Sequence, residues 1–377
     1  MASFTELLER FTSGAHAGSI VGIDMGTSSI KVVEIAKEDE RAVLRNYGEI
    51  ALGPLADVSV GQATSLSQEK LSTALRDILR EMGVTVEHSA FAIPFSASLL
   101  TIVDLPDVSK SELETMVPFE ARRYIPVPIA EVTLNWWVLP KVKEANVTPV
   151  PDLPPGIPPE VQSRPVIIAA VHNDVFKKLE TLKKDVGLPE KASHFEIEVF
   201  STLRSAIGRD LSPTLVMDIG AGTTKLALIA EGVVWGSHTI SMGGQNITSA
   251  LSKSLNIPFE RAEEIKRQAG MLGNEEGRDV AAVSELILAN MFTEAKRTVE
   301  EYERRYGRKI EKVILVGGGA AMKGILHTAA LFFKNLSVTV GNPFARVEFP
   351  PFLAKTIGEI SPAFSVAIGV ALKGLEE

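Results

Sequence analysis

Two stretches of the chain share one hydrophobic pattern: an apolar run, a polar loop that contains aspartate and glycine, and a second apolar run. The first stretch is VGIDMGTSSIKVVEI at residues 21–35, and the second is LVMDIGAGTTKLALI at residues 215–229. After a turn, each continues into another strand-like stretch, at 42–52 and at 233–241. The pattern predicts a meander of three strands that occurs twice, and therefore a fold with two similar halves.

Helical periodicity alternates with these strands. Residues 67–83 place apolar side chains at helical spacing, and residues 246–307 form a helical block whose last part carries mixed charges on a solvated face. A short buried strand within 312–325 ends in three glycines, and residues 361–375 are an apolar helix that we expect between the halves. The alternation of strands and helices predicts the α/β class.

Residues 89–190 break the symmetry between the two halves. They contain several further strand-like and helical stretches, which predict a small α+β unit inserted into the first half. Five prolines lie between residues 151 and 159, so an extended loop is expected over 148–165.

The N-terminal residues 1–17 have the pattern of a short amphipathic helix. Ser3 and Glu6 form a capping-box pair, and the apolar side chains that follow fall on one face. Acidic residues stand where a signal peptide would have a basic region, which argues against such a peptide. We expect this segment to dock on the protein or on a partner, and any membrane contact to be weak.

Composition excludes several classes of function. The chain has 377 residues, enough for two or three structural units, and an ordinary 45% of apolar residues. Its net charge of -8 argues against non-specific binding of nucleic acid. Without cysteine there is no disulfide, thiolate zinc site or thiol nucleophile. No apolar stretch approaches the ~20 residues of a membrane span.

The two polar loops have the chemistry of an anion site. Glycine lets backbone N–H groups converge on a phosphate, hydroxyl groups add neutral donors, and lysine adds an ammonium. Aspartate at the strand end repels phosphate, so its natural role is through a hydrated Mg²⁺, held by Asp24 and Asp218. The residues predicted to contact phosphate are Gly26, Thr27, Ser28, Ser29, Lys31, Gly220, Gly222, Thr223, Thr224 and Lys225.

Three consecutive glycines follow the later buried strand. Gly317, Gly318 and Gly319, followed by Ala320, let the backbone pass flat against a planar ligand such as a purine. Three glycines alone are a weak signal. Their position after the second loop and the helical block makes the signal much stronger.

These features together resemble the actin-like ATPases over nearly the whole chain. The matching parts are phosphate loops at 24–31 and 218–225, an adenosine motif at 316–320, and connecting helices at 196–205 and 361–371. The resemblance implies a duplicated actin-like (ribonuclease H-like) α/β fold, with two halves around a cleft that binds ATP and Mg²⁺.

The resemblance also assigns further site residues. It places Gly243 and Gly244 in a turn near the phosphates, and it places Glu263, Lys266 and Arg267 against the ribose and purine. Asp24, Asp218 and Glu198 are the catalytic candidates that it implies, with Glu196 as another acid that could position water. One departure concerns Ala221, which stands where actin has an acid, so at most slow ATP hydrolysis is expected.

The inserted unit narrows the resemblance to one family. FEARRYIPVPIAEVTLNW and, near the end, EISPAFSVAIG resemble the PilM family of type IV pilus assembly proteins, in the FtsA-like branch. This implies a cytoplasmic protein at the inner face of the bacterial inner membrane. It would dock the N-terminal tail of PilN, from the PilN/PilO membrane complex, in a groove of the inserted unit, and it could self-associate. Plain packing of the helix end at Arg122, Arg123 and Tyr124 remains an alternative for that segment.

Other functions stay open at this point. A related type II secretion complex would use the same kind of component. An FtsA-like division protein is less favoured, because ALKGLEE follows the core helix directly, where a membrane helix is expected in that family. A small-molecule kinase would need an aspartate as general base in the inserted unit, and none can be assigned.

We therefore divide the chain into six parts. They are an N-terminal segment (1–17), the first core half (18–88 and 191–211), an inserted α+β partner-binding subdomain (89–190), the second core half (212–243 and 308–360), a helical nucleotide-contacting subdomain (244–307) and a C-terminal connecting helix (361–377).

Overall fold

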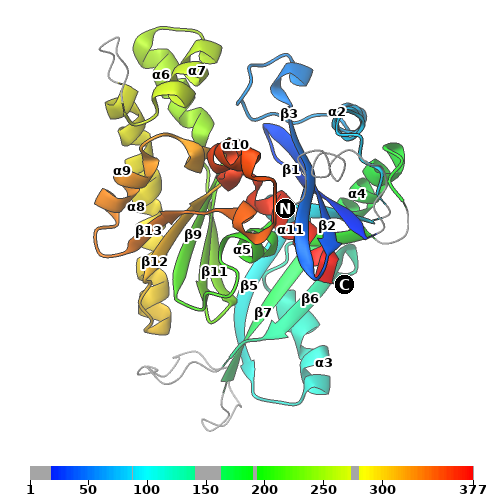
Figure 1. Ribbon diagram of the computed structural model, residues 1–377. Helices are drawn as coiled ribbons and strands as arrows, with labels where there is room; N and C mark the ends of the chain where they lie inside the picture. Colours follow the sequence, from blue (N-terminus) through cyan, green and yellow to red (C-terminus); the bar gives the residue numbers. More distant parts are fainter. Residues whose placement is uncertain (1–17, 87, 141–162, 190–192, 273–279, 377) are drawn as a thin grey trace.

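Two five-stranded sheets with the same topology form the centre of the molecule (Figure 1). The computed structural model describes residues 18–86, 88–140, 163–189, 193–272 and 280–376, so the predicted N-terminal helix and most of the proline-rich loop lie outside it. The first sheet has the order β3(Arg41–Ala51), β2(Ser29–Glu38), β1(Ser19–Met25), β4(His88–Ile93), β8(Ser193–Ile197). The second has the order β11(Val233–Ile240), β10(Thr224–Ala230), β9(Thr214–Ile219), β12(Lys312–Val316), β13(Ser337–Val340).

The duplication extends to the direction of every strand. In each sheet the first three strands along the chain form an antiparallel meander, and the two later strands add in parallel. The two predicted meanders are therefore confirmed, as is the division of the fold into similar halves. A polar loop at the tip of each first hairpin places the two candidate phosphate loops at equivalent points.

One strand and one helix that were predicted in the inserted unit belong to the first half. The strand at 89–94, assigned to the inserted unit, is β4, and it pairs in parallel with β1 in the first sheet. Helix α4(Asn173–Asp185) packs on α2(Gln68–Glu81), also on the first half. Parallel pairing joins residues far apart in sequence, so the hydrophobic pattern gives no sign of it.

The inserted unit is a three-stranded antiparallel sheet of order β5(Ser98–Pro106), β7(Ser163–His172), β6(Val132–Val138), covered by α3(Lys110–Ala121). The last three residues of the predicted loop at 148–165 are the start of β7. Side chains of β7 are buried on both faces. Val166, Ile168 and Ala170 pack under α3, whereas Ile167 joins the core of the second half and Ala169 joins that of the first. The central strand of the inserted sheet therefore contributes side chains to three of the four hydrophobic cores among the described residues.

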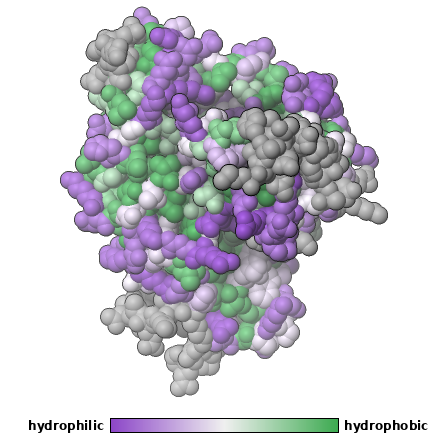
Figure 2. Space-filling model, viewed as in Figure 1, coloured by the Kyte–Doolittle hydropathy of each residue, from purple (hydrophilic) through white to green (hydrophobic). Residues whose placement is uncertain are grey.

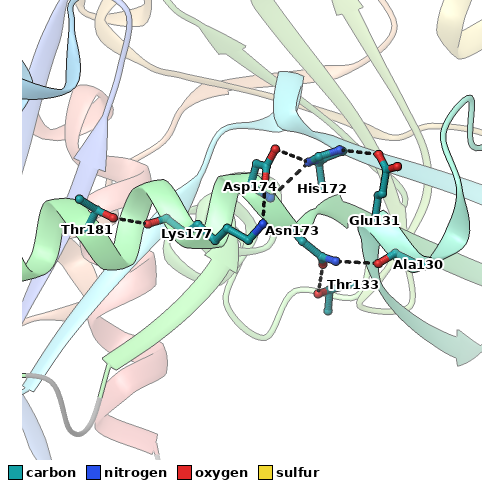
Figure 3. Close-up of polar contacts among 8 residues, drawn as sticks. All are labelled: Ala130, Glu131, Thr133, His172, Asn173, Asp174, Lys177 and Thr181. Atoms are coloured by element: carbon teal, nitrogen blue, oxygen red, sulfur yellow. Dashed lines mark hydrogen bonds and ion pairs between the residues drawn. The ribbon is translucent and has the colours of Figure 1, made fainter.

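A polar joint holds the inserted sheet to α4 (Figure 3). Asn173, the first residue of α4, donates to the Ala130 carbonyl at 3.0 Å and accepts from Thr133 Oγ1 at 2.9 Å. Next to it, His172 Nε2 lies 3.5 Å from Glu131 Oε2. These contacts join the edge of β6 to a helix of the first half.

The C-terminal helix α11(Ser365–Glu376) packs between α5(Glu198–Ala206) and strands β1 and β4. Glycines make this approach close. A Cβ on Gly22 would lie 2.3 Å from the Ala367 carbonyl oxygen, and one on Gly369 would lie 1.8 Å from that of Ser201. Residues Pro351–Leu375 are long and apolar enough to cross a membrane, but 61% of their most apolar window is buried within the protein, as in a core helix.

The remaining described elements cover the outer faces of the second half and the connections. The helices are α6(Gly244–Leu255), α7(Phe259–Ala269), α8(Val280–Tyr306), α9(Ile325–Phe332) and α10(Ala354–Ile360). The short 3₁₀ turns are η1(Gly53–Ala56), η2(Phe95–Ala97), η3(Ile129–Glu131), η4(Gly318–Ala321), η5(Pro343–Arg346), η6(Pro351–Leu353) and η7(Ser361–Phe364).

Most of the visible surface mixes polar and apolar residues (Figure 2). A larger green area lies on the left, over α9 and β13, where Leu326 and Leu331 are exposed.

The close packing of α11 gives a first prediction. Gly369→Ala should lower the free energy of unfolding by about 1–3 kcal/mol, because the new Cβ meets a backbone oxygen that cannot rotate away. Gly358→Ala, on α10 with no atom near its Cβ, is the matched control and should raise the free energy of unfolding by up to about 1 kcal/mol, because alanine is favoured over glycine inside a helix. Urea unfolding measures the free energy of unfolding of both variants. A Gly369→Ala protein as stable as the natural protein would show that α11 does not pack as described.

Candidate functional site

The two polar loops have the same backbone geometry. Gly26 N donates to the Ser29 carbonyl and Gly220 N donates to the Thr223 carbonyl, both at 3.0 Å. In both hairpins the aspartate of the inner strand pairs in register with the lysine of the next strand, Asp24 with Lys31 and Asp218 with Lys225. The local sequence thus builds the same turn twice, with an acid and a base at its root.

The floor of the site is a cluster of acids around one lysine. Lys225 Nζ lies 2.8 Å from Glu198 Oε2 and 3.7 Å from Asp218 Oδ2. Glu198 begins α5 and is buried, and its other carboxylate oxygen accepts from the Phe95 N–H. Burial alone would lower the pKa of Lys225, but the charges of Asp218 and Glu198 outweigh it and raise the pKa above its ordinary value. The ammonium is therefore permanently charged.

Asp24 faces the same cluster from the first half. Burial raises its pKa from 3.8 to about 6, the charge of Lys31 opposes this rise, and the charges of Glu198 and Asp218 add to it. The three acids predicted as catalytic thus lie close enough to influence one another electrostatically, although they come from β1, α5 and β9.

The two equivalent lysines point to different partners. Lys31 donates to Ser29 Oγ at 2.7 Å and pairs at 3.3 Å with Glu49, a residue of β3 that sequence analysis missed. Burial would raise the pKa of Glu49, but Lys31, Ser29 and more remotely Arg267 hold it below its ordinary value. Lys31 is therefore held by Ser29 and Glu49 while its charge acts on Asp24, whereas Lys225 is held by Glu198 and Asp218.

The hydroxyl residues of the loops divide into two groups. Ser29 and Thr224 are buried, and Thr224 Oγ1 donates to the Met242 carbonyl at 2.9 Å, so their hydroxyls support the hairpins. Thr27 is exposed, and Ser28 and Thr223 are half-buried. The second group is the one whose hydroxyls are placed to reach a ligand.

The triple glycine packs on the root of the second loop. A Cβ on Gly317, which has φ +83°, would lie 2.3 Å from Asp218 Oδ1, and one on Gly319 would lie 2.3 Å from Ile219 Cγ2. A Cβ on Gly318 would meet nothing within 4 Å. Two of the three glycines are therefore required by the protein itself, and only Gly318 leaves open space beside the backbone; Ala320 after them is buried.

The turn before α6 lies against the second loop. Gly244 N donates to the Gly220 carbonyl at 2.9 Å, and a Cβ on Gly243 would lie 2.5 Å from the Ala221 carbonyl oxygen. These contacts place the N-terminus of α6 beside the second loop. That Gly243 and Gly244 lie near the phosphates of a ligand stays a prediction.

Helix α7 contributes an ion-paired group. Glu263 is buried, and its two carboxylate oxygens accept from Thr248 and Lys266 on one side, at 2.6 Å each, and from Arg267 on the other, at 2.7 Å. Burial would raise the pKa of Glu263, but these three partners hold it below its ordinary value. Burial lowers the pKa of Lys266 from its ordinary value, and Glu263 opposes the shift. The three residues predicted to contact ribose and purine therefore form one cluster.

A loop of the first half crosses to this cluster, which sequence analysis did not foresee. Ala63 N donates to Gln245 Oε1 at 3.0 Å, and a Cβ on Gly61 would lie 2.7 Å from Glu263 Cδ. From the other side, a Cβ on Gly222 would lie 3.2 Å from Ala63 Cβ. In the sequence, the small residues around Gly61 are the feature that could have indicated this contact. An ordinary turn has the same composition, so the contact could not be predicted from them.

One expected acid lies outside the site. Glu196 pairs with Arg204 at 2.6 Å and accepts from Ser201 Oγ, which are contacts within the first half. It therefore holds α5 to β8, and among the two acids proposed to position water only Glu198 faces the cluster.

Comparison with known proteins identifies the family. Residues 22–375 match the family of type IV pilus assembly protein PilM. The chain belongs to this family. A solved structure described as a PilM-PilN type IV pilus biogenesis complex superimposes with a TM-score of 0.75 at 24% identity, and the match covers 95% of this chain and 99% of that one.

Further relatives agree with an actin-like fold in the FtsA-like branch. The ethanolamine utilization protein EutJ from Carboxydothermus hydrogenoformans has a TM-score of 0.54 at 18% identity, with 98% and 96% of the two chains covered. The cell division protein FtsA of Agrobacterium fabrum is 25% identical over 179 residues, 41% of this chain. That of Neisseria meningitidis is 29% identical over 181 residues. The match spans about 39–41% of the length of these two FtsA proteins, so it carries no activity to this PilM-family chain.

The raised pKa of Asp24 gives a second prediction. The Asp24 carboxyl group binds its proton more tightly in the folded state than in the unfolded state. The free energy of unfolding of the protein therefore falls as pH rises from the unfolded pKa of Asp24, near 3.8, to its folded pKa of about 6. Asp24→Asn should therefore raise the free energy of unfolding at pH 7 by up to about 3 kcal/mol. Urea titrations in EDTA without nucleotide measure this, and a variant less stable than the natural protein at pH 7 would contradict it.

Proposed function

We propose that this PilM-family chain binds ATP between its two glycine turns and docks the N-terminal tail of PilN in its inserted unit. It would do so as the cytoplasmic, actin-like component of type IV pilus assembly, at the inner face of the bacterial inner membrane. The observation that carries the proposal is the repeated turn, with Gly26 and Gly220 in equivalent positions on facing halves.

The open side of Gly318 supports the nucleotide. Gly318 is exposed and a Cβ there would meet no protein atom within 4 Å, so a planar base or sugar can approach the backbone closely at this point. The two turns add backbone N–H donors for phosphates. The first N–H groups of α6 are instead used within the protein, where Gly244 N donates to the Gly220 carbonyl and Gln245 N donates to the Ala221 carbonyl.

Glu263, Lys266 and Arg267 lie beside the first turn of α6, where Lys266 donates to the Gly244 carbonyl at 3.1 Å. The resemblance places the ribose and purine against these three residues.

Mg²⁺ fits the site only in part. Asp24 and Asp218 are the residues that would hold it, and Mg²⁺ accepts few protein carboxylates because it keeps several waters. Within the described residues, no group of three or more His, Asp or Glu side chains has metal-binding geometry. When bound, the ion would neutralise phosphate charge.

The contacts of Glu198 support slow hydrolysis. An acid that orients an attacking water must direct acceptor lone pairs at that water, and bonds to other groups reduce the lone pairs that it has left. Glu198 has one carboxylate oxygen on Lys225 and the other on the Phe95 N–H. Together with Ala221 in place of an acid, this favours a protein that holds ATP and rarely cleaves it.

The position of β7 supports a link between nucleotide and partner. Because β7 packs on the cores of both halves, a change in the angle between them would reach the inserted sheet. Arg305 of α8, 3.9 Å from Asp104 of β5, is a second contact between the inserted unit and the second half. We infer that ATP changes the affinity of the inserted unit for PilN through these contacts.

Substitution of Gly318 tests the nucleotide site. Gly318→Val should abolish ATP binding, because its side chain enters the open space without meeting protein atoms. Gly358→Val, at another glycine whose Cβ would meet no atoms, is the matched control and should bind ATP normally. Calorimetry measures binding and circular dichroism checks the fold. Unchanged affinity in a folded Gly318→Val protein would remove the site assignment.

A synthetic peptide of the PilN N-terminus tests the partner. It should bind the full chain, with an affinity that differs at least about threefold between ATP-bound and ATP-free protein, within the range of coupling between sites. A scrambled peptide is the control. Absence of binding at millimolar peptide would overturn the proposal that the inserted unit docks PilN, whereas equal affinities would exclude only the link to nucleotide.

A further inference from the structure

The loop of the first half that crosses to α6 and α7 is anchored to its own half at both ends. This loop, the strap, consists of residues 59–64 and lies between η1 and α2. At one end, Gly53 packs so closely on the strap that a Cβ there would lie 2.4 Å from the Ser59 carbonyl oxygen. At the other end, Thr64 N donates to the Thr27 carbonyl at 2.9 Å. The strap is therefore bonded directly to the first polar loop.

The strap meets the second half at three points. Ala63 N donates to Gln245 Oε1 at 3.0 Å. The backbone of Gly61, which has φ +86°, packs against the carboxylate of Glu263, where a Cβ would lie 2.7 Å from Oε1. The Cβ of Ala63 lies 3.2 Å from the position of a Cβ on Gly222 in the second polar loop. The strap thus joins both polar loops and α7 on one side of the candidate site.

Gln245 connects the strap to the second polar loop. Its backbone N–H donates to the Ala221 carbonyl at 2.9 Å, and its side-chain oxygen accepts from the strap. The contacts at Gly61 and Gly222 are packing contacts, so the hydrogen bond of Gln245 gives this closure its direction. One hydrogen bond between neutral groups adds little net stability. A closure held in this way slows the separation of the halves and still opens reversibly.

We propose that the strap is a closure between the two halves, held by Gln245, that limits how fast a nucleotide enters and leaves the site. The inference rests on the proposed function, since it presumes that both polar loops and Glu263 hold the nucleotide. A ligand held by these three groups leaves only when they separate, and the strap keeps all three together. Gln245 acts through the strap and is therefore a positioning residue.

The first test is the rate at which the full chain releases the fluorescent analogue mant-ATP after a chase with excess ATP. Gln245→Met removes the acceptor at similar side-chain length and should speed release about threefold or more, the loss of one hydrogen bond. Gln62→Met is the matched control, the same change within the strap at a side chain that forms no hydrogen bond among the described residues. It should leave the release rate unchanged.

The dissociation constant separates a closure from a ligand contact. Loss of a closure speeds entry as well as release, so Gln245→Met should change the dissociation constant less than it changes the release rate. A residue that touches the nucleotide would change both by the same factor. Circular dichroism checks that the variant is folded.

A disulfide across the strap gives an independent test. The chain has no cysteine, so Ala63→Cys with Gly222→Cys introduces a single pair. The 3.2 Å between the two Cβ positions is slightly shorter than the ~3.5–4.5 Å of a disulfide and needs only a small adjustment. Oxidation with mant-ATP bound should slow release at least about tenfold compared with the reduced double variant, and dithiothreitol should restore the faster rate.

The outcomes distinguish the inference from the proposed function. Equal release from the oxidised and reduced double variant, or natural release rates in Gln245→Met, would overturn the inference while leaving ATP binding intact. A disulfide that does not form would contradict the contact between the strap and the second loop and overturn it as well. Absence of mant-ATP binding by the natural protein would overturn the proposed function and, with it, the inference.

Discussion

A single backbone hydrogen bond, repeated in each half, sets the geometry on which the site depends. The glycine N–H closes the turn onto the carbonyl three residues later, at Gly26 and again at Gly220. The closed turn leaves an aspartate at the end of the inner strand and a lysine at the start of the next. A Cβ at either position would lie only 3.0–3.1 Å from the accepting carbonyl oxygen, so a larger residue would press on the hydrogen bond that closes the turn. The acidic floor, the position of Lys225 and the packing of Gly317 on Asp218 all follow from these turns.

The same structure joins the site to a distant surface through ordinary packing. The loop at 61–64 touches α6 and α7 above the site, and β7 packs below it against the cores of both halves. The inserted sheet is also fixed to α4 by Asn173. A change in the angle between the halves would therefore strain several contacts at once, since close-packed cores transmit displacement. This is a physical route from nucleotide to partner that needs no dedicated residue.

What the sequence could predict was what is local or repeated. The two hairpins were predicted with their glycine, aspartate and lysine residues at equivalent positions. This was possible because the residues that form a turn are adjacent in the sequence. The placement of β4 was wrong, since parallel pairing joins distant segments. The contacts of Lys225 with Glu198, of Ala63 with Gln245 and of Lys31 with Glu49 were not foreseen, because each depends on how separate elements come together. The sequence thus predicted which types of residue form the candidate site, but it did not predict which charged side chains pair with one another.

The central claim is that both turns hold one nucleotide together. Hydrogen–deuterium exchange with and without ATPγS tests it most directly, because it reports on the backbone N–H groups of each loop separately. The account predicts that ATPγS slows exchange in 24–29, in 218–223 and in 317–320 over the same range of nucleotide concentration. Protection of one loop without the other, or of neither, would contradict it.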